Sequence, residues 1–150
     1  MTTGAVQSGS VDVRLAVNHW RTAIYSHENN HPETRHICAR VEDMDIADSD
    51  LPDINFLMAG IECTYHSNAR GSAPINDQKR ASAWRVLDWI QGYKPDWCVF
   101  ENVREFLQWG PVDDNGRKIK EVAGTTFKAW VAAIESYGYH VEWKVLNAAD

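Results

Sequence analysis

Short apolar runs alternate along this chain with longer stretches in which apolar residues recur at helical spacing. Runs rich in β-branched and aromatic residues predict strands over residues 11–17, 54–59, 97–101 and 140–146, with a weaker fifth strand over 35–39. Helical patterns cover residues 20–30, 77–92 and 125–138. Strands that alternate with helices of this length are typical of an α/β fold with a mostly parallel sheet and helices on both faces.

The composition and length predict a single domain. The 150 residues contain no internal repeat or linker, and they are 44% hydrophobic and 24% charged, as in a soluble globular domain. Three cysteines without regular spacing argue against a disulfide framework, and no apolar run is long enough to span a bilayer. We therefore expect a cytoplasmic protein that is not embedded in a membrane.

The net charge does not indicate a nucleic-acid-binding surface, which is usually basic. It is −6 for the whole chain. Nucleic-acid binding is not excluded, because a local group of cations can steer a polyanion to its site. One such group lies close to Cys63 in the sequence and consists of Arg70, Lys79, Arg80 and Arg85.

Polar stretches follow three of the predicted strands. They are Asn18-His19-Trp20, Ile61-Glu62-Cys63 and Glu101-Asn102-Val103. In open parallel sheets, ligands bind beyond the carboxyl ends of the strands. The sequence therefore predicts a binding site bordered by these stretches.

Cys63 is the first candidate for chemistry at these strand ends. Its thiolate would be a nucleophile, and the polar and basic residues 65–71 would favour that ionised form. The alternative is a buried, inert cysteine, which is also how we interpret Cys38 and Cys98.

Glu101 is the second candidate. A carboxyl group at the end of an apolar strand is costly to bury without a partner. Desolvation would let the Glu101 carboxyl hold a proton near neutral pH and donate it. Asn102 belongs either to the same site or to the cap of the segment that follows.

Residues 27–31 read His-Glu-Asn-Asn-His, which matches the H-E-x-x-H pattern of zinc proteases. Asn29 and Asn30 are poor helix formers, and Pro32 disfavours helical geometry at the residue before it. The sequence marks no third ligand. We therefore exclude the protease and interpret the pattern as a polar helix end with surface histidines.

Together the strand-end motifs resemble those of the cytosine-C5 DNA methyltransferases, in the bacterial and phage form found in restriction–modification systems. The resemblance extends over nearly the whole chain. It is carried, in order, by residues 18–20, 59–63 and the basic loop after them, 77–80, 101–103 and 146–150. It implies a Rossmann-like, S-adenosylmethionine-dependent methyltransferase fold, of which residues 1–150 form an incomplete catalytic domain.

The resemblance also implies a reaction. A methyl group would pass from S-adenosylmethionine to carbon 5 of a cytosine flipped out of double-stranded DNA. Cys63 would add to carbon 6 and so activate carbon 5, while Glu101, with Asn102 beside it, would neutralise charge at ring nitrogen 3. Ser67 and Arg70, in the loop that closes over the base, would contact DNA phosphates.

The same resemblance assigns cofactor-binding residues. Trp20 would stack on the adenine ring, and His19 stands where the family commonly has an acid that binds the ribose hydroxyls. Val41 follows the weaker fifth strand, near the position that contacts the adenine amino group in the family. The full set of cofactor-binding residues is Asn18, His19, Trp20, Val41 and Gly60.

Parts of the family's catalytic domain have no counterpart in the 150 residues. The first strand, with its glycine-rich turn, would lie in the sheet between the strands predicted over 11–17 and 54–59. The target-recognition region and the closing helix have no counterpart either. We therefore expect this chain not to methylate DNA by itself. Two alternatives stay open: an RNA cytosine-C5 methyltransferase, and a non-catalytic remnant that acts as a binding or regulatory module.

Overall fold

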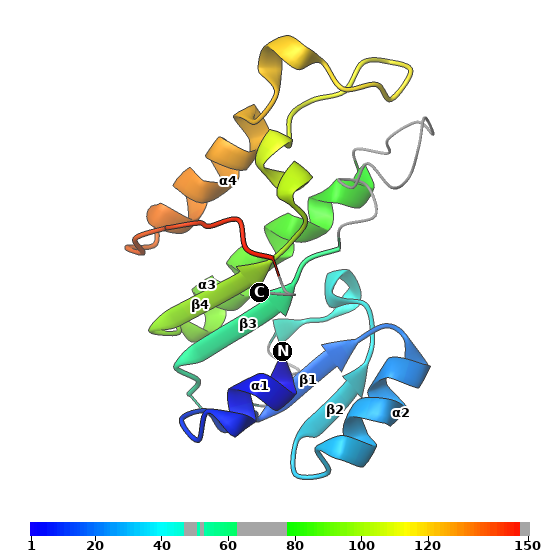
Figure 1. Cartoon of the computed structure of the whole chain (residues 1–150), viewed down its shortest axis with the longest axis vertical. Coiled ribbons are helices and arrows are strands. Elements are labelled where there is room, and N and C mark those ends of the chain that lie inside the picture. Colours follow the sequence, from blue (N-terminus) through cyan, green and yellow to red (C-terminus); the bar gives the residue numbers. More distant parts are fainter. Residues whose placement is uncertain (47–50, 52, 63–77, 148–150) are drawn as a thin grey trace. The chain divides into compact units, whose positions relative to one another are not determined.

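The computed structural model describes residues 1–46, 51, 53–62 and 78–147 (Figure 1). The chain divides into two compact units, Met1–Met58 with Gly92–Cys98 and Ala59–Gln91 with Val99–Asp150. Helices and small parallel strand pairs make up the described residues, which confirms the α/β class. Within these residues no helix is both long and apolar enough to cross a membrane.

The first unit is built around a strand–helix–strand motif. Two parallel strands pair with Leu15 opposite Arg35 and Asn18 opposite Cys38, and the helix that connects them contacts both. The elements are α1 (Thr2–Gln7), β1 (Leu15–Asn18), α2 (Arg21–Asn30), β2 (Arg35–Cys38) and the 3₁₀ turn η1 (Val41–Asp43).

The connection from α2 to β2 determines where the strand pair begins. The Thr34 amide donates to the carbonyl of His31 over 3.1 Å, and the buried Thr34 hydroxyl donates to the carbonyl of Val13 over 3.0 Å. Because of this turn, β2 begins at Arg35. The strand predicted over 11–17 therefore appears as Leu15–Asn18, the residues that stand opposite Arg35–Cys38 in the ladder.

β3 (Phe56–Gly60) and β4 (Trp97–Glu101) form the second strand pair and lie side by side in Figure 1. The Trp97 amide donates to the carbonyl of Asn55 over 3.1 Å at the start of the strands. The Ile61 amide donates to the carbonyl of Glu101 over 3.2 Å at their end. The starts of the two strands are thus bonded to each other, and so are their ends, which shows that the strands run in parallel.

The remaining elements lie between and after these strands. They are the 3₁₀ helix η4 (Gln78–Arg85), α3 (Val86–Tyr93), the 3₁₀ segments η5 (Arg104–Gln108) and η6 (Lys120–Val122), and α4 (Thr125–Glu135). The helix predicted over 77–92 is therefore α-helical only in its second half. Among residues 82–85 only Ala83 is fully buried, whereas α3 buries Val86, Trp89 and Ile90.

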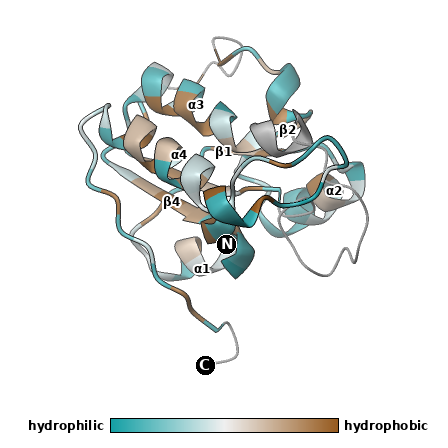
Figure 2. Cartoon of the chain, turned by 90° about the horizontal axis from the view of Figure 1, so that it is seen from above, coloured by the Kyte–Doolittle hydropathy of each residue, from teal (hydrophilic) through white to brown (hydrophobic). Residues whose placement is uncertain are grey.

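All but one of the buried apolar side chains of the described residues belong to the second unit, and the exception is Pro95 in the first unit. α4 contributes Phe127, Trp130, Val131 and Ile134, whose spacing places them on one helix face. Trp130 lies 5.6 Å from Phe100 and 5.4 Å from Phe106, ring centre to ring centre, with both pairs edge to face. Apolar (brown) segments run along α3 and α4 in Figure 2. The other buried apolar residues are Ile61, Ala83, Val86, Trp89, Ile90, Phe106 and Trp109.

The strand predicted over 140–146 is wrong: these residues adopt no regular structure. Leu146 is 75% exposed and Trp143 60%, although the Trp143 ring also meets Phe127 edge to face. Alternating apolar residues form a strand only when another strand supplies hydrogen-bond partners. In the described part of the chain β4 pairs with β3 alone, and residues 140–146 form no ladder with either strand.

Strand pairing in the described residues joins β1 to β2 and β3 to β4, with no ladder between the two pairs. The family resemblance predicts a further strand between β1 and β3. A single Rossmann-like sheet with helices on both faces stays a prediction.

Replacing Trp130 with Phe tests the aromatic core. The indole Nε1–H donates to the buried carbonyl of Ala83 over 2.9 Å, and Phe removes this donor while keeping an aromatic ring. We expect the free energy of unfolding to fall by about 1–3 kcal/mol, measured by urea denaturation followed by far-UV circular dichroism. The matched change at exposed Trp143, also to Phe, should alter it by less than about 0.5 kcal/mol. Equal losses in the two variants would contradict this account.

Candidate functional site

The ends of β3 and β4 are joined by hydrogen bonds to both backbone groups of Ile61. The Ile61 amide donates to the Glu101 carbonyl over 3.2 Å, and the Asn102 Nδ2 donates to the Ile61 carbonyl over 3.3 Å. The Asn102 Oδ1 in turn accepts from the Val103 amide over 2.8 Å. The Asn102 side chain therefore bridges the two strand ends, and the interpretation as a local cap alone is incomplete.

Glu101 is exposed, so the desolvation predicted for its carboxyl group is not observed. Residues of β4 alternate between exposed and half-buried, and side chains two apart share a face. Glu101 consequently lies on the same open face as Trp97, which is 73% exposed, and Val99, which is 48% exposed. Its carboxyl group is open to a ligand from solvent.

Three predicted site residues, Cys63, Ser67 and Arg70, lie outside the described residues. The last described residue before them, Glu62, follows the bridged Ile61 directly. The structure thus fixes the point at which the chain leaves β3 toward Cys63. The roles of these three residues stay predictions.

The end of β1 carries the predicted adenine-binding residues. The Asn18 Oδ1 accepts from the Trp20 amide over 2.8 Å, which forms a tight turn into α2. The Cys38 thiol at the end of β2 donates weakly to the His19 carbonyl over 3.8 Å. Trp20 caps α2 and is 63% exposed, so it is not a core tryptophan. Its indole face is available for stacking.

Two further cofactor-binding candidates are placed on their own elements. Val41 is half-buried and begins η1, shortly after β2 ends, so it and Trp20 follow the carboxyl ends of two paired strands. Gly60 is the exposed last residue of β3. Cys38 is exposed and Cys98 half-buried, so the interpretation of Cys38 as a buried cysteine is wrong.

The interpretation of the His-Glu-Asn-Asn-His segment as surface histidines is also wrong. His31 is buried, with 8% of its surface exposed, and His27 is half-buried. Their rings lie 4.8 Å apart, as expected for histidines four residues apart at a helix end, and His36 from β2 joins them. The spacing signalled that His27 and His31 share a face, but nothing in the sequence indicated His36. Among the described residues no group of three or more His, Cys, Asp or Glu side chains is arranged so that it could hold a metal ion.

Comparison with known proteins adds a family-level finding. A family model described as "C-5 cytosine-specific DNA methylase" matches residues 1–150. Type II methyltransferase M.Sau3AI of Staphylococcus aureus is 30% identical over 115 residues, covering 75% of this chain and 25% of that protein. Type II methyltransferase M.Bsp6I of Bacillus sp. (strain RFL6) is 34% identical over 102 residues, covering 67% and 29%. Type II methyltransferase M.NlaIV of Neisseria lactamica is 30% identical over 105 residues, covering 70% and 24%. The chain therefore spans about a quarter of the length of these relatives.

Replacing Asn102 with Asp tests the bridge between the strand ends. Asp keeps the acceptor for the Val103 amide but sets a carboxylate oxygen against the Ile61 carbonyl, where the amide now donates. We expect faster hydrogen exchange of the Ile61 amide and a loss of about 1–3 kcal/mol in the free energy of unfolding.

Gln108→Glu is the control for Asn102→Asp, because it makes the same amide-to-acid change at an exposed position. It should leave Ile61 exchange unchanged. Unaltered exchange of Ile61 in the Asn102→Asp protein would show that the side chain does not hold the strand end.

Proposed function

The chain belongs to the C-5 cytosine-specific DNA methylase family, and we propose that it forms part of the catalytic domain of a DNA cytosine-C5 methyltransferase. The enzyme would transfer a methyl group from S-adenosylmethionine to carbon 5 of a cytosine flipped out of double-stranded DNA. The names of the three relatives above identify them as Type II methyltransferases, which supports DNA methylation.

One observation carries the proposal: the hydrogen-bonded junction between the ends of β3 and β4. Asn102 and the Glu101 carbonyl hold Ile61, which lies two residues before Cys63. A nucleophile and an acid that act on one small ring need to start from neighbouring backbone positions. Adjacent ends of paired parallel strands supply such positions.

The proposed chemistry begins with addition of the Cys63 thiolate to carbon 6 of cytosine. The new bond ends the ring's aromaticity and gives carbon 5 the electron density to attack an electrophilic methyl group. Glu101 would hydrogen-bond ring nitrogen 3 and offset the charge that builds there. After methylation, loss of the carbon-5 proton returns its electron pair to the ring and expels Cys63.

The residues proposed for the cofactor suit their roles. S-adenosylmethionine, when bound, supplies a methyl group on a positively charged sulfur. The exposed indole of Trp20 offers a stacking face, and the Asn18 Nδ2 and the exposed His19 offer hydrogen-bonding groups. We assign cofactor contacts also to Val41 and to Gly60, which has no side chain to obstruct a ligand.

Double-stranded DNA is the proposed partner. Ser67 and Arg70 follow Cys63 in the sequence and carry a hydroxyl group and a guanidinium group, both of which bind phosphate oxygens. We propose that they contact phosphates on either side of the flipped base.

Replacing Cys63 with Ser tests the proposed reaction. The assay measures transfer of labelled methyl from S-adenosylmethionine to DNA and, separately, to RNA. The assay compares two proteins: the 150 residues alone, and a longer protein in which they are joined to the residues that any flanking coding sequence encodes. We expect no transfer by the 150 residues alone and transfer to DNA by the longer protein. Cys63→Ser should lower the longer protein's rate by at least about a thousandfold.

Cys38→Ser is the control for Cys63→Ser, because it replaces an exposed thiol and keeps a donor to the His19 carbonyl. It should retain activity. Transfer to RNA alone would favour the RNA enzyme. Binding of S-adenosylmethionine without any transfer would favour a binding module.

Replacing Trp20 with Ala tests the proposed adenine contact. Loss of the stacking surface should weaken binding of S-adenosylmethionine by about five- to fiftyfold, measured by calorimetry, because one stacked ring contributes about 1–2 kcal/mol. Tyr25→Ala removes another exposed aromatic side chain of α2, one that is 66% exposed, and should leave affinity unchanged. Equal losses in both variants would argue against a specific Trp20 contact.

A further inference from the structure

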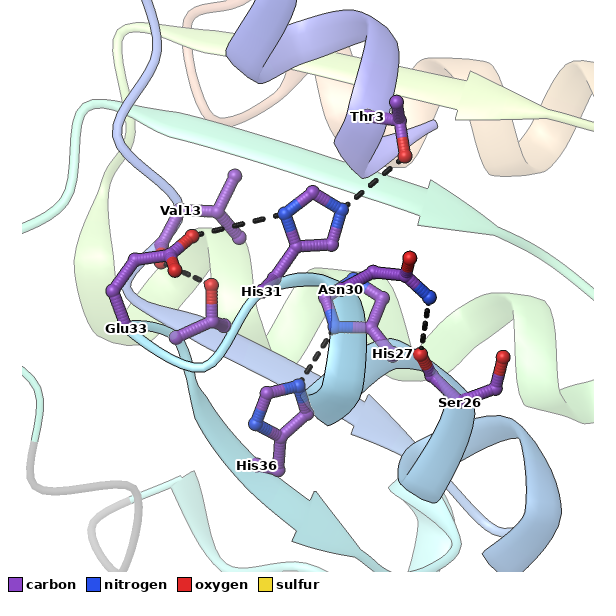
Figure 3. A network of polar contacts seen from close by, with 9 residues as sticks. Thr3, Val13, Ser26, His27, Asn30, His31, Glu33 and His36 are labelled. Atoms are coloured by element: carbon purple, nitrogen blue, oxygen red, sulfur yellow. Dashed lines mark hydrogen bonds and ion pairs between the residues drawn. The ribbon is translucent and has the colours of Figure 1, made fainter.

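Three imidazole rings meet where α2 ends and β2 begins (Figure 3). The Nδ1 of His27, on α2, lies 2.7 Å from the Nε2 of His36, on β2, within hydrogen-bonding distance. The His27 ring centre lies 4.8 Å from that of His31 and 4.9 Å from that of His36. We refer to His27, His31 and His36 as the histidine cluster.

Only one hydrogen atom can lie between the facing ring nitrogens of His27 and His36. A bond between two ring nitrogens needs one N–H donor and one lone pair, so one of the two facing nitrogens must be unprotonated. If both rings were charged, the facing nitrogens would both carry hydrogens and would repel. A second proton therefore breaks the link between α2 and β2.

The other ring nitrogen of His27 makes protonation of this residue costly. His27 Nε2 is buried and finds no hydrogen-bond partner in the described part of the chain. A lone pair without a partner is tolerated better than a buried N–H without an acceptor. The favoured neutral form therefore has hydrogen on Nδ1, which donates to His36, and the charged form would bury an unpaired N–H.

Other polar and charged groups lie near the histidine cluster, and they belong to the elements that pack against it. His31 Nε2 lies 3.2 Å from the Thr3 Oγ1 of α1, and His31 Nδ1 lies 3.7 Å from the Glu33 carboxylate. The amino group of Met1 adds positive charge near His27, and exposed Glu33 is the acid that offsets it. β1 contains no ionisable side chain, and Arg14 before it is paired with Asp12 at 2.8 Å.

We propose that the histidine cluster is a proton-sensitive latch, closed when His27 and His36 share one proton and opened when a second proton enters. Closure joins α2 to β2 directly and to α1 through His31. Opening frees the carboxyl-terminal end of α2 from β2, the strand that follows it.

The pH range of the latch follows from His27. Burial lowers the pKa of His27 below its ordinary value of 6.5, and the positive charges of His36, His31 and the amino terminus lower it further. The folded unit thus binds fewer protons than the unfolded chain. The stabilisation is present above pH 6.5 and is lost as the pH falls below that value.

Opening of the latch would also affect the cofactor if the proposed function holds. Trp20 is the N-cap residue of α2, and the histidine cluster holds the carboxyl-terminal end of the same helix. On that proposal, affinity for S-adenosylmethionine should fall together with protection of α2. The latch itself is tested by hydrogen exchange, which needs neither cofactor nor DNA.

The experiment compares amide protection factors in α2 and β2, corrected for intrinsic exchange, in the full chain with EDTA present. One extra proton can lower protection by up to about tenfold per pH unit. For the unaltered chain we expect a fall of about three- to tenfold between about pH 6.5 and about pH 5.5. His27→Gln should nearly abolish this fall, since an amide can bond to His36 without titrating, and His36→Gln should reduce it. His140→Gln changes an exposed histidine outside the cluster and should keep the full fall.

Three results would overturn the latch. One is an unaltered pH profile in His27→Gln, and another is a loss of the profile in His140→Gln. The third is failure of both cluster variants to fold at about pH 7.5, where Gln supplies the same hydrogen bonds as neutral His, since the rings would then act only by packing. If protection falls with pH while affinity for S-adenosylmethionine stays constant, the latch stands and the Trp20 proposal fails.

Discussion

The backbone of Ile61 is the point on which the arrangement of the site depends. Its amide is bound by the Glu101 carbonyl and its carbonyl by the Asn102 side chain, so both of its polar groups are held by residues that end β4. No residue within β3 or β4 is fully buried, so the hydrogen bonds at the strand ends contribute to fixing the relative position of the two strands. Ile61 itself is buried, which shields these two hydrogen bonds from competing water.

The sequence predicted α4 and β4 best. The apolar spacing from Phe127 to Ile134 located α4, and the run 97–101 located β4 at its observed bounds. Residues 140–146 carried an equally clear pattern but formed no strand, because a strand depends on a partner that local sequence does not specify. The position of Glu101 at a strand end was predictable. Its exposure was not, since exposure depends on which face of β4 other elements cover.

Burial of single residues was also beyond local sequence. Trp20 was open to interpretation as a core residue or a binding residue, and it is exposed because the Asn18 turn places it at the cap of α2. His31 was interpreted as a surface residue, yet Thr3, twenty-eight positions earlier, contacts its ring. Such contacts between distant segments decide burial, and periodicity within one helix carries no information about them.

The two units are stabilised by different interactions, and this difference has consequences for the proposed site. The buried apolar side chains of the described residues belong to the second unit with the single exception of Pro95, whereas the buried polar residues, His31 and Thr34, belong to the first. Hydrophobic burial varies with temperature and little with pH, whereas hydrogen bonds between imidazoles depend on proton concentration. The proposed adenine-binding residue Trp20 lies in the first unit, and Glu101 and Asn102 in the second. Mild acid should therefore act on the proposed adenine-binding residue Trp20 before it acts on the residues proposed for catalysis.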